Sequence, residues 1–209
     1  MAGPDDAGRR FVALNCTLKP GPEASSTDVL LDAVTGELET LGFTGETIRV
    51  VDRGVAHGVT ADEGDGDGWP AIREQVLAAH LLVVGTPIWL GHPASPCQQV
   101  LERLDAFLGE TDDRGQMATV DRVALVAVVG NEDGAHHVGA ELFQGLNDVG
   151  FTIPAGGMTY WVGEAMGSTD LKDLDAIPES TMSQARTMAA NGAHLVSLLS
   201  GDGRYPSLD

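Results

Sequence analysis

A chain of 209 residues is long enough for one well-buried domain and short for two. Hydrophobic residues make up 43% of it and charged residues 21%, a balance that is typical of globular proteins and excludes a disordered or fibrous chain. The formal net charge of -19 repels phosphate backbones and anionic lipid headgroups, so we expect neither a nucleic-acid nor a membrane partner.

Five apolar segments bounded by turn residues predict β-strands. The segments 81–85 and 123–129 are apolar at nearly every position, which is typical of strands that are covered on both faces. The sheet is therefore expected to be parallel. The predicted strands span residues 10–15, 44–51, 81–85, 122–129 and 152–161.

Segments with helical spacing of apolar residues lie between and after these strands. They predict helices over residues 26–41, 69–79, 95–108, 135–149 and 180–199. The acidic, glycine-rich stretches 61–68 and 111–116 are predicted to be solvated loops, and the first lacks the terminal glutamate that a calcium loop needs. Residues 1–9 and 201–209 are expected to be frayed tails.

The alternation of strand and helix predicts one α/β domain over residues 1–209. Right-handed crossovers would give a doubly wound, five-stranded parallel sheet with helices on both faces. Ligands of such sheets bind beyond the carboxyl ends of the strands, where the strand order reverses. Three loops leave strands at that edge, and each has an unusual composition.

The first loop, residues 15–27, is suited to a phosphate group. It offers hydroxyl groups, one of the chain's two lysines, and the free N–H groups at the start of a helix. The alternative is that the serines only cap the helix. Neither a Walker A motif nor a dinucleotide-binding glycine motif is present, which favours a monophosphate. The candidate residues are Thr17, Lys19, Ser25, Ser26 and Thr27.

The second loop, residues 85–95, combines turn residues with large apolar side chains. An apolar segment at a sheet edge suggests a wall for a flat, partly apolar ring. Alternatively, the tryptophan packs into the core or a dimer contact. The candidate residues are Pro87, Ile88, Trp89, Leu90 and Gly91.

The third loop, residues 130–137, offers hydrogen-bonding groups to the polar edge of a heterocycle. Its two histidines also raise the possibility of a metal, but adjacent histidines point apart on a helix and no third ligand is spaced to join them, so we expect no metal site. The candidate residues are Gly130, Asn131, Glu132, Asp133, Gly134 and His136.

The two cysteines, Cys16 and Cys97, lie far apart and lack the spacing of a disulfide framework or metal cluster. The first ten residues contain no apolar segment that could serve as a signal peptide, and no later stretch approaches the ~20 apolar residues of a membrane span. We therefore expect a cytoplasmic protein.

Taken in order, the three loops resemble those of the flavodoxin-like NAD(P)H-dependent FMN reductase family. Thr17-Leu18-Lys19 and Ser25-Ser26-Thr27 are similar to the segments that contact the FMN phosphate in that family. The segment from Thr86 to Gly91 is similar to the one that lines the isoalloxazine, and residues 130–137 to the one at the pyrimidine side. Asn15-Cys16 departs from the small residues that are commoner at that position.

The resemblance implies FMN as cofactor and NAD(P)H as co-substrate. NAD(P)H would transfer a hydride to the flavin, and the reduced flavin would then pass electrons to a small acceptor such as a quinone or free flavin. Because the cofactor carries this chemistry, we name no catalytic residue. A homodimer or homotetramer is possible. Two alternatives remain open: an electron carrier without turnover of its own, and a flavin-free member of the family.

Overall fold

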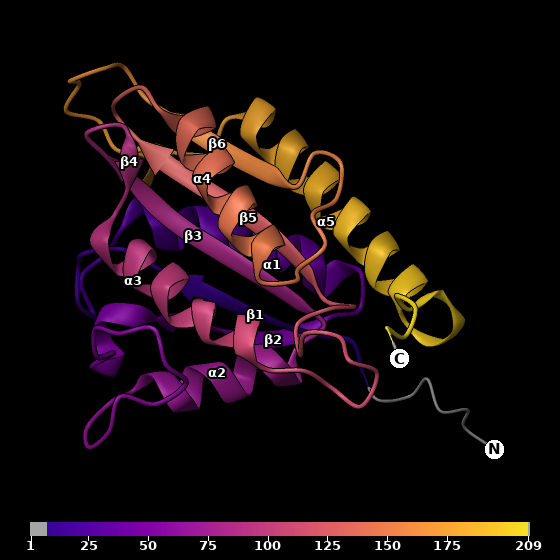
Figure 1. Ribbon diagram of the computed structural model, residues 1–209. Helices are drawn as coiled ribbons and strands as arrows, with labels where there is room; N and C mark the ends of the chain where they lie inside the picture. Colours follow the sequence, from indigo (N-terminus) through magenta and orange to yellow (C-terminus); the bar gives the residue numbers. More distant parts are fainter. Residues whose placement is uncertain (1–7, 209) are drawn as a thin grey trace.

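The computed structural model describes residues 8–208, and the predicted N-terminal tail therefore lies largely outside the described residues. Five parallel strands form one sheet in the order β2-β1-β3-β5-β6 (Figure 1). This is the predicted doubly wound arrangement. The strands are β1 Arg10–Asn15, β2 Thr44–Arg49, β3 Leu81–Trp89, β5 Val123–Gly130 and β6 Met158–Val162; the short β4, His92–Pro93, pairs antiparallel with the end of β3.

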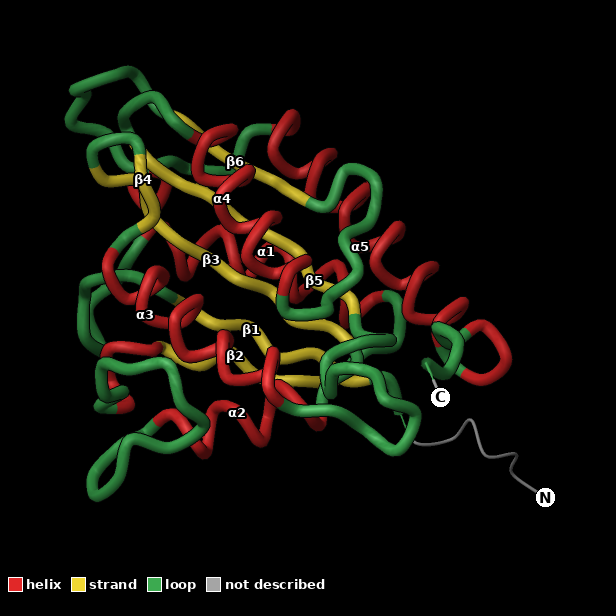
Figure 2. The backbone as a smooth tube through the Cα atoms, viewed as in Figure 1, coloured by secondary structure: helices red, strands yellow, loops and turns green. Residues whose placement is uncertain are grey.

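Helices cover both faces of the sheet (Figure 2). Side chains alternate between the faces of a strand, so Phe11 and Ala13 of β1 pack toward one helical layer while Val12 and Leu14 pack toward the other. The first layer contains α1 Ser26–Thr40 and α5 Glu179–Leu199; the second contains α2 Trp69–Ala78, α3 Ser95–Leu104 and α4 Ala135–Asp148. No described helix is both long and apolar enough to cross a membrane.

β3 and β6 differ most from the predicted bounds, whereas β2 ends two residues early, at Arg49, and β5 is shifted by one residue. β3 continues past Gly85 to Trp89 and turns back through Leu90 and Gly91, whose φ angles of 54° and 80° fit a two-residue hairpin turn. β6 begins only at Met158, because a turn closed by the Gly157 N–H and the Pro154 carbonyl interrupts the segment that begins at Thr152. Proline has no N–H to donate to the ladder.

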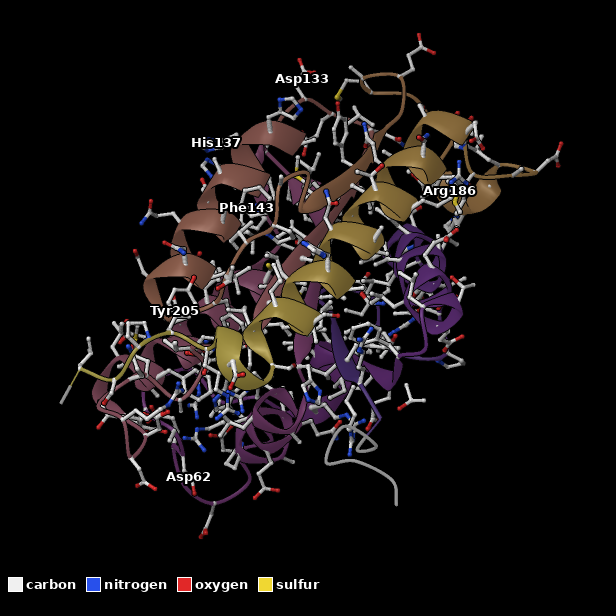
Figure 3. All side chains as sticks on the ribbon, turned by 90° about the vertical axis from the view of Figure 1, so that its right-hand side faces the viewer. Asp62, Asp133, His137, Phe143, Arg186 and Tyr205 are labelled. Carbon is white, nitrogen blue, oxygen red and sulfur yellow. The ribbon has the colours of Figure 1, made fainter. Side chains whose placement is uncertain are left out.

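Residues 201–208 are not frayed as predicted. The Tyr205 N–H donates to Asp121 Oδ1 at 2.8 Å, and the Leu208 N–H donates to the Arg114 carbonyl at 3.0 Å. Figure 3 shows Tyr205 in this segment, which runs back past the end of α5. The C-terminal residues therefore pack along the loop that precedes β5.

The acidic loop 61–68 is also less solvated than predicted, because its Asp67 side chain is only 1% exposed. Asp67 Oδ2 lies 2.7 Å from Nη2 of Arg103 on α3, a side chain with no exposed area. Asp67 also accepts hydrogen bonds from the N–H groups of Ala56, Glu63 and Trp69. Burial alone would raise the pKa of Asp67, but these amides and the guanidinium hold it below its usual value.

Substituting Asp67→Ala should therefore destabilise the protein strongly, since it leaves the buried Arg103 guanidinium without its main partner. Breaking such a buried pair costs about 3 to 5 kcal/mol. Urea unfolding followed by circular dichroism measures this loss. The matched control is Asp65→Ala, which removes an exposed carboxylate from the same loop and should leave the free energy of unfolding nearly unchanged.

Acid provides a second readout of the same interaction. A pKa that folding lowers contributes stability that is complete above the unfolded pKa and is lost as the pH falls through the lowered folded value. The acid limb of a stability–pH curve should thus be shallower for Asp67→Asn than for the wild type. Equal slopes would contradict the role assigned to this carboxylate.

Candidate functional site

The three predicted ligand loops leave the sheet at the same edge. Asn15 at the end of β1 is paired with Gly85 of β3, which is paired with Ala127 of β5, so the chain passes from all three strands into loops on one side. The chain goes from β1 outward to β2 and then returns to β3 on the other side, so the strand order reverses here. Figure 1 shows β4 and the segment after β6 at this end, away from the C-terminal end of α5.

The Asp28 carboxylate organises the first loop. It accepts hydrogen bonds from the Ser25 N–H at 3.1 Å and the Ser25 hydroxyl at 2.9 Å, while Ser25 Oγ accepts from the Asp28 N–H. Asn15 Nδ2 and Arg49 Nη2 also donate to this carboxylate. Ser25 thus caps α1, as the alternative interpretation of this loop predicted, and its hydroxyl already forms hydrogen bonds with Asp28.

Arg49, at the end of β2, holds the backbone of the first loop in place. Its Nη1 donates to the carbonyl oxygens of Lys19 at 3.2 Å and Glu23 at 2.8 Å, while Nη2 forms an ion pair with Asp28. Asn15, Asp28 and Arg49 are not among the residues that the sequence predicts for the site. The available signals were an arginine at a strand end and an acidic residue three positions after a helix-capping serine.

The remaining candidates of the first loop surround the start of α1. The Thr17 N–H donates to Asn15 Oδ1 at 2.9 Å, and Thr17 Oγ1 accepts from the Lys19 N–H at 3.3 Å. Thr27 is buried. The N–H groups of Ser26 and Thr27 belong to the first turn, where no intrahelical acceptor exists. This helix start can therefore bind an anion.

Both lysines of the chain lie near this helix start. Lys19 Nζ lies 3.5 Å from Glu23 Oε1, and its side chain is 39% exposed. The Lys172 N–H donates to Ser26 Oγ at 3.3 Å, and its ammonium lies 2.8 Å from Asp173 Oδ1. That hydrogen bond raises the pKa of Lys172 and lowers the pKa of Asp173. Lys172 was not predicted because it lies 146 positions after Ser26 along the chain.

The second loop forms a hairpin whose tip carries exposed apolar side chains. Trp89 is 55% and Leu90 89% exposed, so the alternative that Trp89 packs into the core is wrong. Ile88 is buried and contacts the base of the third loop at Gly130 rather than facing solvent. Pro87 is partly buried at the end of β3, where it pairs with Val129 of β5.

The third loop packs directly against the hairpin. A Cβ atom added to Gly134, whose φ is +123°, would lie 2.8 Å from Gly91 Cα. Only glycine fits this contact without displacing backbone. Glu132 is partly buried, whereas Asp133 and His136 are exposed, and the His136 ring meets Tyr160 edge-on with centroids 5.2 Å apart.

Asn131 connects the third loop to the segment after β6. Its side-chain Nδ2 donates to Asp170 Oδ1 at 2.9 Å, and its backbone carbonyl oxygen accepts from the Met166 N–H at 2.9 Å. Its Oδ1 is buried, and no donor within the described chain reaches it. Burying an acceptor without a donor is costly, and Gly163 lies directly beside this oxygen, so a ligand N–H would reach it only after the Asn131 side chain or the segment after β6 had moved.

The segment after β6 adds a cavity of about 560 Å³, which was not predicted from the sequence. It follows a strand that the sequence predicted, but its own residues carry no recognisable motif. The segment after β6 links the third loop to the start of α1, because Asp170 accepts a hydrogen bond from Asn131 and the Lys172 N–H donates to Ser26. The cavity is lined by Trp161, Gly163, Glu164, Ala165, Met166, Gly167, Ser168, Thr169 and Leu174.

One of the two histidines of the third loop lies beside further potential metal ligands. Glu141 lies one turn after His137 on α4, a spacing that the sequence contains, whereas His92 comes from β4, 45 positions earlier, and only the fold brings it close. Their ligand atoms lie within 4.8 Å of one another.

Two curated proteins are similar to the chain over most of its length. The divalent metal cation transporter MntH of Mycobacterium bovis is 36% identical over 205 residues, which are 95% of this chain, but the chain spans only 30% of that relative. The 8-demethyl-8-aminoriboflavin-5'-phosphate synthase of Streptomyces davaonensis is 31% identical over 200 residues, 91% of this chain and 78% of the relative.

Solved structures are similar in fold as well. RosB with bound 8-demethyl-8-formylriboflavin-5'-phosphate has a TM-score of 0.81 at 30% identity, over 93% of this chain and 81% of that one. The apo NADH:FMN oxidoreductase EmoB has a TM-score of 0.68 at 17% identity, over 96% of each chain.

The sequence profile described as NADPH-dependent FMN reductase matches residues 9–167, more than half of the chain. Together with the parallel sheet order and the relatives above, this match confirms the family that the three loops indicated. The chain belongs to the NADPH-dependent FMN reductase family.

Proposed function

We propose that this flavin-dependent oxidoreductase binds FMN across the three loops, takes hydride from NAD(P)H and passes the electrons to a quinone, a flavin or a similar small acceptor. The main support for the proposal is that three chemically different features lie at the same edge of the sheet. An anion-binding helix start, an exposed apolar hairpin tip and a buried acceptor without a donor follow β1, β3 and β5 at a single edge of the sheet.

The residues present fit the three chemical parts of FMN. A phosphate suits the N–H groups of Ser26 and Thr27, supported by Lys19. The flat isoalloxazine suits the apolar tip made by Trp89 and Leu90. The N–H on the pyrimidine part of the ring suits Asn131 Oδ1.

When bound, FMN supplies the hydride and electron transfer. The chain's own residues would bind and orient it. The helix start holds the phosphate, the hairpin tip shields the ring from water, and Asn131 fixes one edge of the ring. A hydrogen bond at that edge also tunes the flavin potential. In this proposal no side chain has to act as acid or base.

A second candidate is supported by the comparisons. The synthase that acts to give 8-demethyl-8-aminoriboflavin-5'-phosphate shares 31% of its aligned residues with this chain, whereas the NADH:FMN oxidoreductase structure shares 17%. A flavin phosphate would then be the substrate of the same pocket rather than a retained cofactor.

Titration with FMN followed by anaerobic addition of NADPH or NADH tests the main proposal. We expect saturable binding and loss of the visible flavin absorption on addition of the nucleotide alone. Binding without reduction would contradict the reductase and favour an electron carrier. A change in the mass of the flavin recovered after aerobic incubation with amine donors would favour the second candidate. No FMN binding would overturn all three.

Lys19→Ala should weaken FMN binding moderately. Hydrogen bonds to charged groups contribute about 1.5 to 3 kcal/mol, but Lys19 is partly exposed and pairs with Glu23, so we expect about 1 kcal/mol, a roughly fivefold higher Kd. Calorimetry measures the change. Arg204→Ala removes one positive charge from an exposed side chain that interacts with Asp121, far from the loops, and should leave the Kd unchanged.

Gly134→Ala should impair the site more than Gly91→Ala. Both glycines have positive φ, so both substitutions strain the backbone by about 1 to 3 kcal/mol. Only the Cβ at position 134 would meet backbone atoms, those of Gly91 itself, and force the third loop away from the hairpin; the Cβ at position 91 meets nothing within 4 Å. Parallel measurements of thermal unfolding and FMN affinity separate strain from displacement. Equal effects of the two variants would show that the contact is unimportant.

A further inference from the structure

Three metal-ligating side chains converge outside the flavin site just described. Nδ1 of His92 lies 2.9 Å from Glu141 Oε1, and Nε2 of His137 lies 2.7 Å from the same oxygen. The two imidazole rings meet edge-on, with centroids 5.0 Å apart. Two exposed histidines from separate elements therefore aim ring nitrogens at one point.

The backbone holds these residues in place. His137 and Glu141 are four positions apart on α4 and so share one face of the helix. His92 lies on β4, where it pairs with Trp89 across the two-residue turn. The contact between Gly134 and Gly91 joins that turn to the start of α4. Figure 3 shows His137 on the outer side of α4 near Asp133.

We propose that His92, His137 and Glu141 bind one divalent transition-metal ion, which links the β3–β4 hairpin to α4. Two imidazole nitrogens and one carboxylate oxygen suit Zn²⁺, Co²⁺, Ni²⁺ or Cu²⁺, whereas Mg²⁺ and Ca²⁺ prefer oxygen ligands alone. Three protein ligands leave at least one position for water or a small anion. The net charge of -19 favours cation binding in general.

The ligand atoms lie within 4.8 Å of one another, so side-chain rotation has to bring them to bonding geometry. Ligand bonds of about 2.1 Å in a tetrahedral array place ligand atoms roughly 3.3 Å apart. The two nitrogen–oxygen distances of 2.9 and 2.7 Å must therefore open by about half an ångström. The side chains are 61%, 56% and 32% exposed for His92, His137 and Glu141, so their rotation meets little packing resistance.

Calorimetry with Zn²⁺ and visible spectroscopy with Co²⁺ test the proposal on untagged, chelator-treated full-length protein. We expect one ion per chain and Co²⁺ bands that are typical of a nitrogen and oxygen ligand set. His92→Ala and Glu141→Gln should each weaken binding by roughly tenfold or more. The matched control is His194→Ala, an exposed histidine on α5 that should leave binding unchanged.

Thermal unfolding gives a second readout. Zn²⁺ should raise the melting temperature of the wild type and of His194→Ala but not of His92→Ala, because only a ligand that binds the folded chain stabilises it. His92 is exposed, so its variant is expected to fold, and its melting temperature without metal checks this. The proposal is overturned if wild type binds no ion at unit stoichiometry, if His92→Ala binds as tightly as wild type, or if Mg²⁺ competes equally with Zn²⁺.

Discussion

The parallel direction of five neighbouring strands is the constraint on which the rest of the structure depends. Parallel strands end at a common edge, so the loops after β1, β3 and β5 meet although they are far apart in the sequence. Each crossover places a helix on one face of the sheet, so the strands carry apolar side chains on both faces, and the helices bury them. The same burial that stabilises the domain thus brings the loops of the proposed ligand site together.

Within that site, structural and binding roles are divided among neighbouring residues. Ser25, Asp28 and Arg49 satisfy one another and hold the shape of the first loop. The N–H groups that follow the cap lie in the first turn, where no intrahelical acceptor exists, and they are the groups that we propose bind the phosphate. A well-ordered loop loses little conformational freedom when a ligand binds, which favours affinity.

Membership of the NADPH-dependent FMN reductase family supports the proposal of a flavin-dependent oxidoreductase. The hairpin between β3 and β4 is the feature through which several proposed properties are connected. Its tip carries Trp89 and Leu90, its turn packs on Gly134, and its return strand brings His92 to α4. The proposed metal ion would restrain an element that also borders the flavin loops.

The sequence by itself determined the strand and helix order, the parallel sheet and the three loops at its edge, because continuous apolar runs and helical periodicity report burial directly. It also located most helix starts within one residue, as at Ser26 and Trp69, where capping and proline signals are local. Only the tertiary structure brought Lys172 to the start of α1, buried Asp67 against Arg103 and joined His92 to His137. Those contacts connect residues that are dozens of positions apart, so no local pattern encodes them; chain folding alone sets their distances.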